Sequence, residues 1–106
     1  MKAYKELVKE ALRLEFTIDL YSEEGLELEN SENYQEVIDL IENLDDLPVL
    51  RFHDNDGCYR GFAQVNLFVN DDESVMDHSI NYTVSSVNPK NSDKWINDWF
   101  QRVVMA

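Results

Sequence analysis

The sequence predicts one α+β domain over residues 1–106, in which a mainly antiparallel, four-stranded sheet of two hairpins packs against about three helices. The expected order is α-β-β-α-β-β-(short element)-α. A chain of 106 residues can bury one modest hydrophobic core and is too short for two. Its 43% hydrophobic and 11% aromatic residues are typical of globular proteins. Apolar side chains recur at helical spacing in some segments and alternate with polar ones in others.

Residues 2–14 are predicted to form an amphipathic helix. Its apolar side chains recur at spacings of three and four, which places on one face Tyr4, Leu7, Val8, Ala11 and Leu12. The opposite face carries a basic row of Lys2, Lys5, Lys9 and Arg13. We interpret this row as a solvated face. The alternative is an electrostatic clamp on the acidic segment that follows.

A β-hairpin is predicted next, over residues 16–29. Apolar and polar side chains alternate over residues 16–21 and again over residues 26–29. The turn between them contains Gly25, which tolerates a positive φ. The outward side of this hairpin is expected to carry Asp19, Glu27 and Glu29.

A second helix is predicted over residues 32–44, with Asn30 and Ser31 as capping side chains. Its buried stripe is expected to contain Tyr34, Val37, Ile38, Ile41 and Leu44. Glu32, Glu36 and Asp39 fall opposite this stripe, and Glu42 falls on its flank. With a rise of ~1.5 Å per residue these carboxylates are roughly 4.5–6 Å apart along the helix axis. That spacing is comparable with the distance between successive phosphates of a nucleic-acid strand.

The second hairpin follows Pro48, which ends the helical segment. Residues 49–53 are predicted to form a strand, residues 54–57 a turn and residues 58–69 the return strand. Gly61 inside the return strand predicts a bulge or the close approach of another element.

The sequence leaves two options for residues 75–87. Residues 75–78 are compatible with a short helix, and the alternation of Ile80, Tyr82 and Val84 is compatible with a strand. A last helix is predicted over residues 93–104, capped by Ser92 and with an apolar side of Trp95, Ile96, Trp99, Phe100 and Val103. We expect the two tryptophans mostly in the core; the alternative is that one of them anchors a partner.

Ten carboxylates lie between residues 22 and 46 with no Lys or Arg among them: Glu23, Glu24, Glu27, Glu29, Glu32, Glu36, Asp39, Glu42, Asp45 and Asp46. They account for much of the net charge of −13, which repels nucleic acid and anionic membranes at neutral pH. We therefore expect a basic protein as the partner, and neither nucleic acid nor a membrane.

No motif in the chain indicates a reaction, so we expect neither an enzyme nor a cofactor. Three glycines are too few for a phosphate-binding loop. Cys58 is expected to be buried as a small hydrophobe, and neither His53 nor His78 has an orienting motif. A pocket that holds one of these histidines beside a carboxylate would favour an enzyme instead.

Two weak metal motifs have simpler interpretations. Asp54-Asn55-Asp56-Gly57 resembles part of a calcium loop but lacks its first and last ligands, and a hairpin turn explains it better. Asp71, Asp72 and Glu73, with Asp77 and His78, are expected to be solvated acids of a loop rather than a cation site. We therefore expect no metal.

The compartment is predicted from what the chain lacks. A single cysteine excludes an internal disulfide framework. No apolar run approaches the length of a signal peptide or a membrane span. We therefore expect a cytosolic protein.

Several landmarks resemble a loosely defined group of small acidic proteins encoded by bacteriophages. Over residues 16–100 these are Ser31 with Tyr34, Ile38 and Ile41, then Asp54 to Gly57, Gly61-Phe62-Ala63, Glu73, Val75, Asp77 and Trp95. The chain departs from the pattern in a longer insert around residues 81–91 and in Phe62, where Trp is usual. The group has no established activity, so the resemblance implies a phage or mobile-element origin and the host cytosol. In size and charge the chain is also similar to phage DNA mimics, from which no residue role transfers.

The predicted function is that of a non-enzymatic, phage-type inhibitor whose nucleic-acid-mimicking surface binds a basic surface of a host nucleic-acid-binding or defence protein. The residues predicted to contact the partner are Glu27, Glu29, Glu32, Glu36, Asp39, Glu42, Asp45 and Asp46. One alternative is an immunity protein that neutralises a basic toxin. Another is an accessory or structural phage protein whose acidity serves only solubility.

Overall fold

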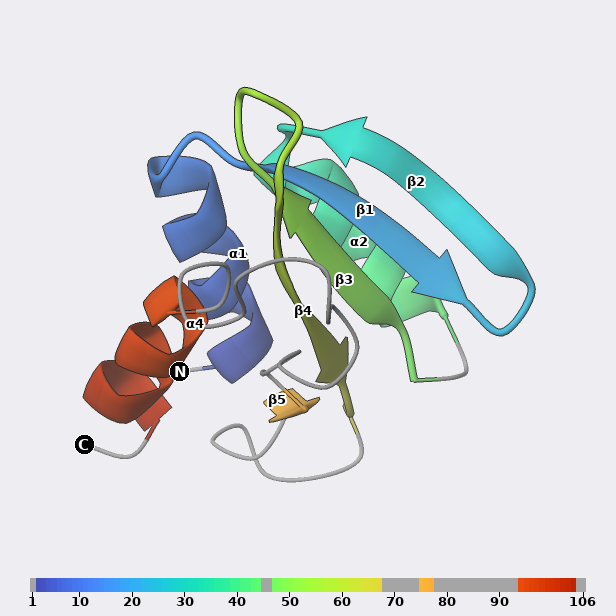
Figure 1. Ribbon diagram of the computed structural model, residues 1–106. Helices are drawn as coiled ribbons and strands as arrows, with labels where there is room; N and C mark the ends of the chain where they lie inside the picture. The colour runs from blue at the N-terminus through green and yellow to red at the C-terminus, as the bar shows by residue number, and fades with distance from the viewer. Residues whose placement is uncertain (1, 45–46, 68–74, 78–93, 105–106) are drawn as a thin grey trace.

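The computed structural model describes residues 2–44, 47–67, 75–77 and 94–104 (Figure 1). It confirms the α+β class and the predicted order of elements. The elements are α1 (Ala3–Arg13), β1 (Thr17–Ser22), β2 (Gly25–Ser31), α2 (Tyr34–Asn43), β3 (Val49–His53), β4 (Tyr59–Val65), β5 (Val75–Asp77), α4 (Lys94–Trp99) and the π-helical η2 (Phe100–Val104).

The strands form one antiparallel sheet in the order β2-β1-β3-β4-β5. Its first four strands are the two predicted hairpins, joined because β1 of the first pairs with β3 of the second. Figure 1 shows α2 behind the strands and α1 and α4 to their left. The strand side chains that alternate toward these helices are buried, as the period-2 pattern predicts: Ile18, Leu20, Leu50, Phe52, Ala63 and Val65.

One hydrophobic core joins the sheet to the helices. Leu7 and Val8 of α1 are fully buried, as are Val37 and Ile41 of α2. Trp99 of α4 is 1% exposed and belongs to the same cluster. The expectation that Trp99 is a core residue is therefore confirmed.

The start of α2 differs from the prediction. The cap is Asn33, whose side chain accepts a hydrogen bond from the Glu36 N–H at 3.1 Å, rather than Asn30 or Ser31. The helix begins later because β2 continues to Ser31, which pairs with Ile18 and is 6% exposed. Glu32 therefore lies between the strand and the helix, outside both.

The second hairpin follows the prediction closely. β3 has the expected bounds, whereas β4 is shorter than residues 58–69, the last two of which lie outside the described residues. Gly61 has a φ of 109°, and the register shifts between Arg51 and His53 on the paired strand. The predicted bulge at Gly61 is therefore confirmed.

The last third of the chain is described only in part. Residues 75–77 form β5, paired with β4, so the short-helix option is wrong for these three residues. The strand option at residues 80–84 and the cap Ser92 lie outside the described residues. The last helix is α-helical only to Trp99 and changes to π-helical winding from Phe100, which the apolar spacing did not predict.

Candidate functional site: an acidic groove

Three chain connections meet at one end of the sheet: α1 to β1, β2 to α2, and the turn from β3 to β4 (Figure 1, top). They enclose a hollow of about 390 Å³ lined by Thr17, Asp19, Glu29, Asn30, Glu32, His53, Asp54, Asn55 and Gly57. A second hollow of about 310 Å³ is lined by Leu12, Glu15, Phe16, Glu32 and Asn55. Because Glu32 and Asn55 belong to both linings, we treat the two hollows as one feature, the acidic groove.

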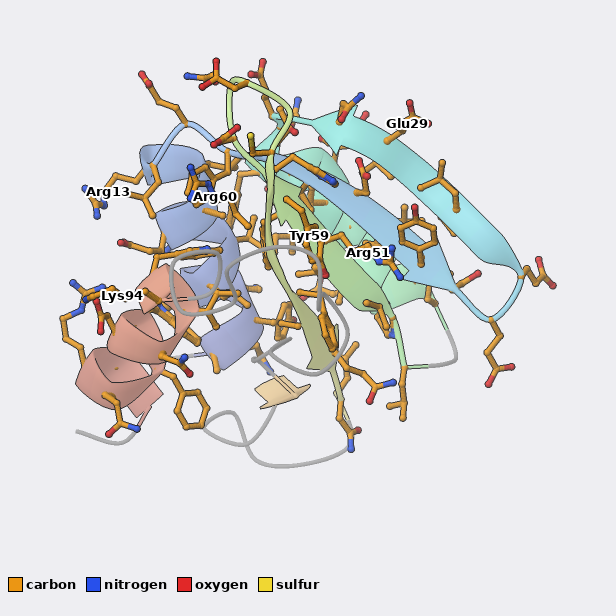
Figure 2. All side chains as sticks on the ribbon, viewed as in Figure 1. Arg13, Glu29, Arg51, Tyr59, Arg60 and Lys94 are labelled. Carbon is orange, nitrogen blue, oxygen red and sulfur yellow. The ribbon has the colours of Figure 1, made fainter. Side chains whose placement is uncertain are left out.

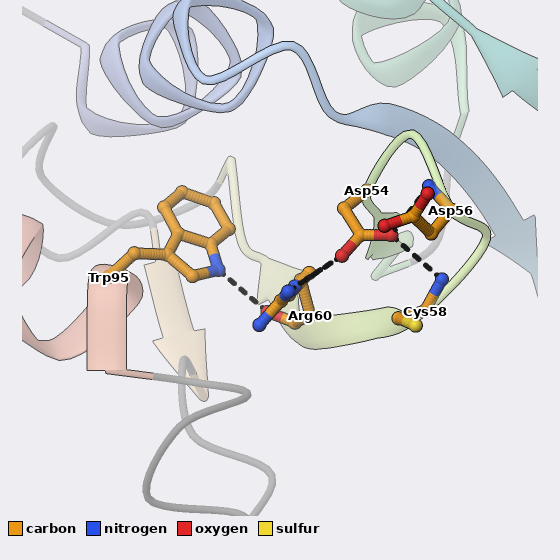
Figure 3. A network of polar contacts seen from close by, with 5 residues as sticks. All are labelled: Asp54, Asp56, Cys58, Arg60 and Trp95. Carbon is orange, nitrogen blue, oxygen red and sulfur yellow. Dashed lines mark hydrogen bonds and ion pairs between the residues drawn. The ribbon is translucent and has the colours of Figure 1, made fainter.

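The wall formed by the β3–β4 turn is organised by Asp54 (Figure 3). Its Oδ1 accepts hydrogen bonds from the N–H groups of Asp56 and Cys58, both at 2.9 Å. Its Oδ2 accepts a forked pair from Arg60, at 2.9 Å from Nε and 2.6 Å from Nη2. The Cys58 N–H and the Arg60 guanidinium stabilise the charged form and hold the pKa of Asp54 below its usual value. Asp54 therefore closes the turn, as predicted, and its charge is compensated.

Trp95 of α4 packs against Phe16, one of the residues that line the smaller hollow. The Trp95 ring packs edge-on against Phe16, with centroids 5.1 Å apart, and against Phe52, with centroids 5.0 Å apart. Its indole Nε1 donates to the Arg60 carbonyl at 2.7 Å (Figure 3). Trp95 is half-buried and packs against the core. The C-terminal helix thus supports the groove from a distant part of the sequence.

Asp19 and His53 lie side by side in the larger hollow. Asp19 is only 8% exposed, so the expectation of an outward-facing carboxylate on the hairpin is wrong for this residue. β1 is flanked by β2 and β3, and the Asn30 N–H donates to Asp19 Oδ1 at 2.7 Å, which covers the side chain. Asp19 Oδ2 is 3.7 Å from His53 Nδ1, beyond hydrogen-bond range. That nitrogen is buried, and no group in the described part of the chain forms a hydrogen bond with it.

Glu29 and Glu32 are the available acids of the groove. Both are exposed, and neither makes a hydrogen bond or an ion pair within the described part of the chain. Figure 2 shows Glu29 pointing outward from β2. Glu15 accepts only a long hydrogen bond from Asn55 Nδ2, at 3.5 Å. The groove therefore has negative charge that no described basic side chain compensates.

The other predicted contact residues lie elsewhere, and the described ones have intramolecular partners. Glu27 accepts from Ser22 Oγ at 2.7 Å near the β1–β2 turn. On α2, Glu36 accepts from Ser31 Oγ at 2.9 Å, and Asp39 accepts from Gln35 Nε2 at 2.7 Å. Asp45 and Asp46 lie outside the described residues. The structure thus separates Glu29 and Glu32 from the rest of the predicted surface.

Glu42 connects α2 to the basic row of α1. It accepts from the Tyr4 hydroxyl at 2.6 Å and lies 3.6 Å from Lys5 Nζ. Two other members of the row pair within α1, Lys9 with Glu6 at 3.0 Å and Arg13 with Glu10 at 2.6 Å. The clamp alternative therefore applies at Lys5, whereas Lys9 and Arg13 form a solvated face, as predicted.

Among the titratable residues of the groove, four were not predicted as contact residues: Glu15, Asp19, His53 and Asp54. The order of the strands could have indicated these residues. In an antiparallel pair the start of one strand lies beside the end of the other, so Thr17 at the start of β1 pairs with His53 at the end of β3. Cys58 is also placed differently from the prediction, since it is exposed at the end of the turn rather than buried. Its backbone bonds to Asp54, and that contact leaves the thiol outside the core.

Neither a metal site nor a membrane-spanning helix is found among the described residues. Within residues 2–44, 47–67, 75–77 and 94–104, no group of three or more His, Cys, Asp or Glu side chains has an arrangement able to hold a metal ion. None of the helices described has the length and apolar character needed to cross a membrane. Asp71, Asp72, Glu73 and His78 lie outside these ranges.

Comparison of the chain with models of protein families, with curated proteins and with solved structures found no match in any of the three.

Proposed function

We propose that the chain is a non-enzymatic inhibitor of the phage type, which binds a basic surface of a nucleic-acid-binding or defence protein through the acidic groove. The observation that carries this proposal is the pair Glu29 and Glu32, two exposed carboxylates on the walls of one groove that have no hydrogen-bond or ion-pair partner among the described residues. In a chain of net charge −13, acids of this kind attract cationic side chains.

The groove suits the end of a long basic side chain. Arg and Lys place an apolar stem behind a charged head, and Leu12 and Phe16 offer an apolar wall beside the carboxylates. A guanidinium is favoured over an ammonium because its planar fork matches carboxylate oxygens. Arginines that bind phosphate in the partner would instead bind Glu29 and Glu32, so the mechanism is competition with nucleic acid.

The charge of the remaining surface assists this competition. Carboxylates on α2 have neutral or cationic neighbours, and they add to the negative field around the groove. Such a field accelerates the encounter with a basic partner and weakens with salt. The groove then supplies the geometric selectivity that net charge lacks.

His53 beside Asp19 is the arrangement that would favour an enzyme, and it fits catalysis less well than binding. A histidine base is normally oriented by a hydrogen bond to its carboxylate, whereas Nδ1 and Oδ2 are 3.7 Å apart. The lining of the larger hollow has one hydroxyl, that of Thr17, and no thiol or amine. We therefore retain binding as the proposed function.

A paired-variant experiment tests the role of the groove. Glu29→Gln combined with Glu32→Gln removes two charges from the groove, and Glu24→Gln combined with Glu27→Gln removes the same charge near the β1–β2 turn. Affinity for an oligoarginine peptide is measured by fluorescence anisotropy at low salt. The groove pair should weaken binding about thirtyfold, since two contacts are lost and each surface contact between unit charges is worth about 1 kcal/mol. The control pair should change it by less than about twofold.

The same variants are then tested for displacement of DNA from a set of basic DNA-binding proteins. The wild-type chain should displace DNA from at least one of them, and the groove pair should not. Equal losses in the two variant pairs would show that overall charge, and not the groove, determines binding. Absence of displacement from every protein, together with no peptide binding, would leave solubility as the role of the acidity.

A further inference from the structure

We infer that His53 and Asp19 form a pH-dependent contact that regulates the charge of the acidic groove; its effect on binding rests on the function proposed above. His53 Nδ1 is buried and has no hydrogen-bond partner among the described residues, and the carboxylate oxygen Asp19 Oδ2 is 3.7 Å away. A buried nitrogen without a partner is unusual in a folded protein. Here it faces an acceptor that a small rotation of the ring would bring within range.

Asp19 is held in position for this contact. Its Oδ1 accepts from the Asn30 N–H at 2.7 Å, which leaves Oδ2 to face His53. Protonation of the ring would place a charged N–H at Nδ1 and close the gap to the roughly 2.8 Å of a charge-assisted hydrogen bond. Histidine is the side chain that commonly changes charge between about pH 5 and 8.

The surroundings of His53 are mainly acidic, and each adjoining element contributes to them. β1 provides Asp19, β2 provides Glu29, and the segment before α2 provides Glu32. The β3–β4 turn provides Asp54, already paired with Arg60 of β4 at 2.6 Å, and β3 itself carries the exposed Arg51. Tyr59 of β4 packs against the ring with centroids 5.6 Å apart, and burial raises the pKa of its hydroxyl to about 12, so it stays neutral.

The sign of the effect follows from these charges. A proton on His53 adds a positive charge inside the groove and engages Asp19 within the protein. Both changes lower the attraction for a cationic side chain. Binding of a basic partner should therefore be weaker when the His53 ring is protonated than when it is neutral.

The contact itself is tested in the free wild-type protein by NMR. The His53 ring signals and the Asn30 amide signal are followed from about pH 8 to about pH 5.5. The Asn30 amide should shift with the same midpoint as the His53 ring, because both groups contact Asp19. This pH-dependent shift of the Asn30 amide should vanish in His53→Gln. It should persist in His78→Gln, which removes the other histidine of the chain. An Asn30 amide that does not respond while the ring titrates would overturn the inference.

The consequence for binding is tested with the oligoarginine peptide at constant ionic strength. Wild type and His78→Gln should lose roughly fivefold in affinity over this pH range, as expected for one added unit charge close to the ligand. His53→Gln should lose clearly less. Equal losses in all three proteins would contradict the regulatory role. A peptide that fails to bind at any pH would contradict the proposed function, whereas the NMR experiment would still decide whether the contact forms.

Discussion

The acidic groove and the exposed side of α2 contain the same kind of side chain in different situations. On α2 the three carboxylates Glu36, Asp39 and Glu42 each accept a hydrogen bond from a neighbouring side chain. In the groove Glu29 and Glu32 have no such partner within the described residues. The difference shows that the number of acids in a segment does not measure how many are available to a ligand. Availability depends on which donors the fold places beside each acid.

The reason lies in the elements that carry the two sets. A helix places residue i beside i+4, so Gln35 lies within reach of Asp39, and α1 packs close enough to bring Tyr4 and Lys5 to Glu42. Glu29 and Glu32 lie on an edge strand and the connection after it, where β1 is the one described strand neighbour. Fewer neighbouring elements leave these two carboxylates to solvent.

The largest effect is expected for Trp99→Ala, which removes a side chain of the hydrophobic core that joins the sheet to the helices. Trp99 is 1% exposed, and large-to-small changes of a buried Trp cost about 3–5 kcal/mol in the free energy of unfolding. Urea denaturation followed by circular dichroism measures this. A loss below about 1 kcal/mol would show that the last helix contributes little to the core.

A smaller effect on stability is expected for Asp54→Asn, which changes a residue of the groove. Its folded-state pKa is lowered below the ordinary 3.8, so its stabilising contribution is present above that value and is lost as the pH falls below it. Wild type should therefore be more stable than Asp54→Asn at pH 7, and the difference should shrink as the solution is acidified below about pH 4. Thermal unfolding across this range provides the measurement, and a difference that is independent of pH would argue against the ionised form of Asp54 as the cause.

The smallest effect is expected when the acids of the groove and those of α2 are neutralised in turn and the free energies of unfolding are compared. Glu29→Gln with Glu32→Gln should leave stability unchanged or raise it by about 0.5 kcal/mol, because it relieves repulsion without breaking a bond. Glu36→Gln with Asp39→Asn removes the same charge but weakens two hydrogen bonds, and Glu36 lies in the first turn of α2. This second pair should lower stability by about 0.5–1 kcal/mol. Chemical denaturation measures the change in the free energy of unfolding. Equal changes for the two pairs would mean that the hydrogen bonds to Glu36 and Asp39 do not contribute to stability.

Much of the fold was predictable because its signals are local. The alternation around Ile18 and Leu20, the three- and four-residue spacing in α1, and Gly61 in β4 each depend on a few neighbouring residues. Two of the predictions that were wrong, the exposure of Asp19 and the start of α2, depended on contacts between residues more than ten positions apart. Asp19 is covered by the chain at Asn30, and α2 begins late because Ser31 is held in the sheet by Ile18.

The candidate site was predictable only in its chemistry. Composition indicated an acidic surface and a basic partner, and Glu29 and Glu32 were among the predicted contact residues. The partners of Glu36 and Glu42 could not be inferred from helical spacing, since Ser31 and Tyr4 donate from outside α2. The contributions of Glu15 and His53 were not foreseen, because they follow from the packing of three separate connections.

The sequence by itself determined the class of this protein, its charge and the positions of its strands and helices, since periodicity and composition act over short stretches of chain. Tertiary structure alone decided which acids are buried, which are paired and which face the groove. Those outcomes depend on the pairing of β1 with β3 and on the docking of Trp95 beneath the groove. Hydrogen bonds and desolvation act over a few ångströms in space, and the sequence does not state which residues come that close.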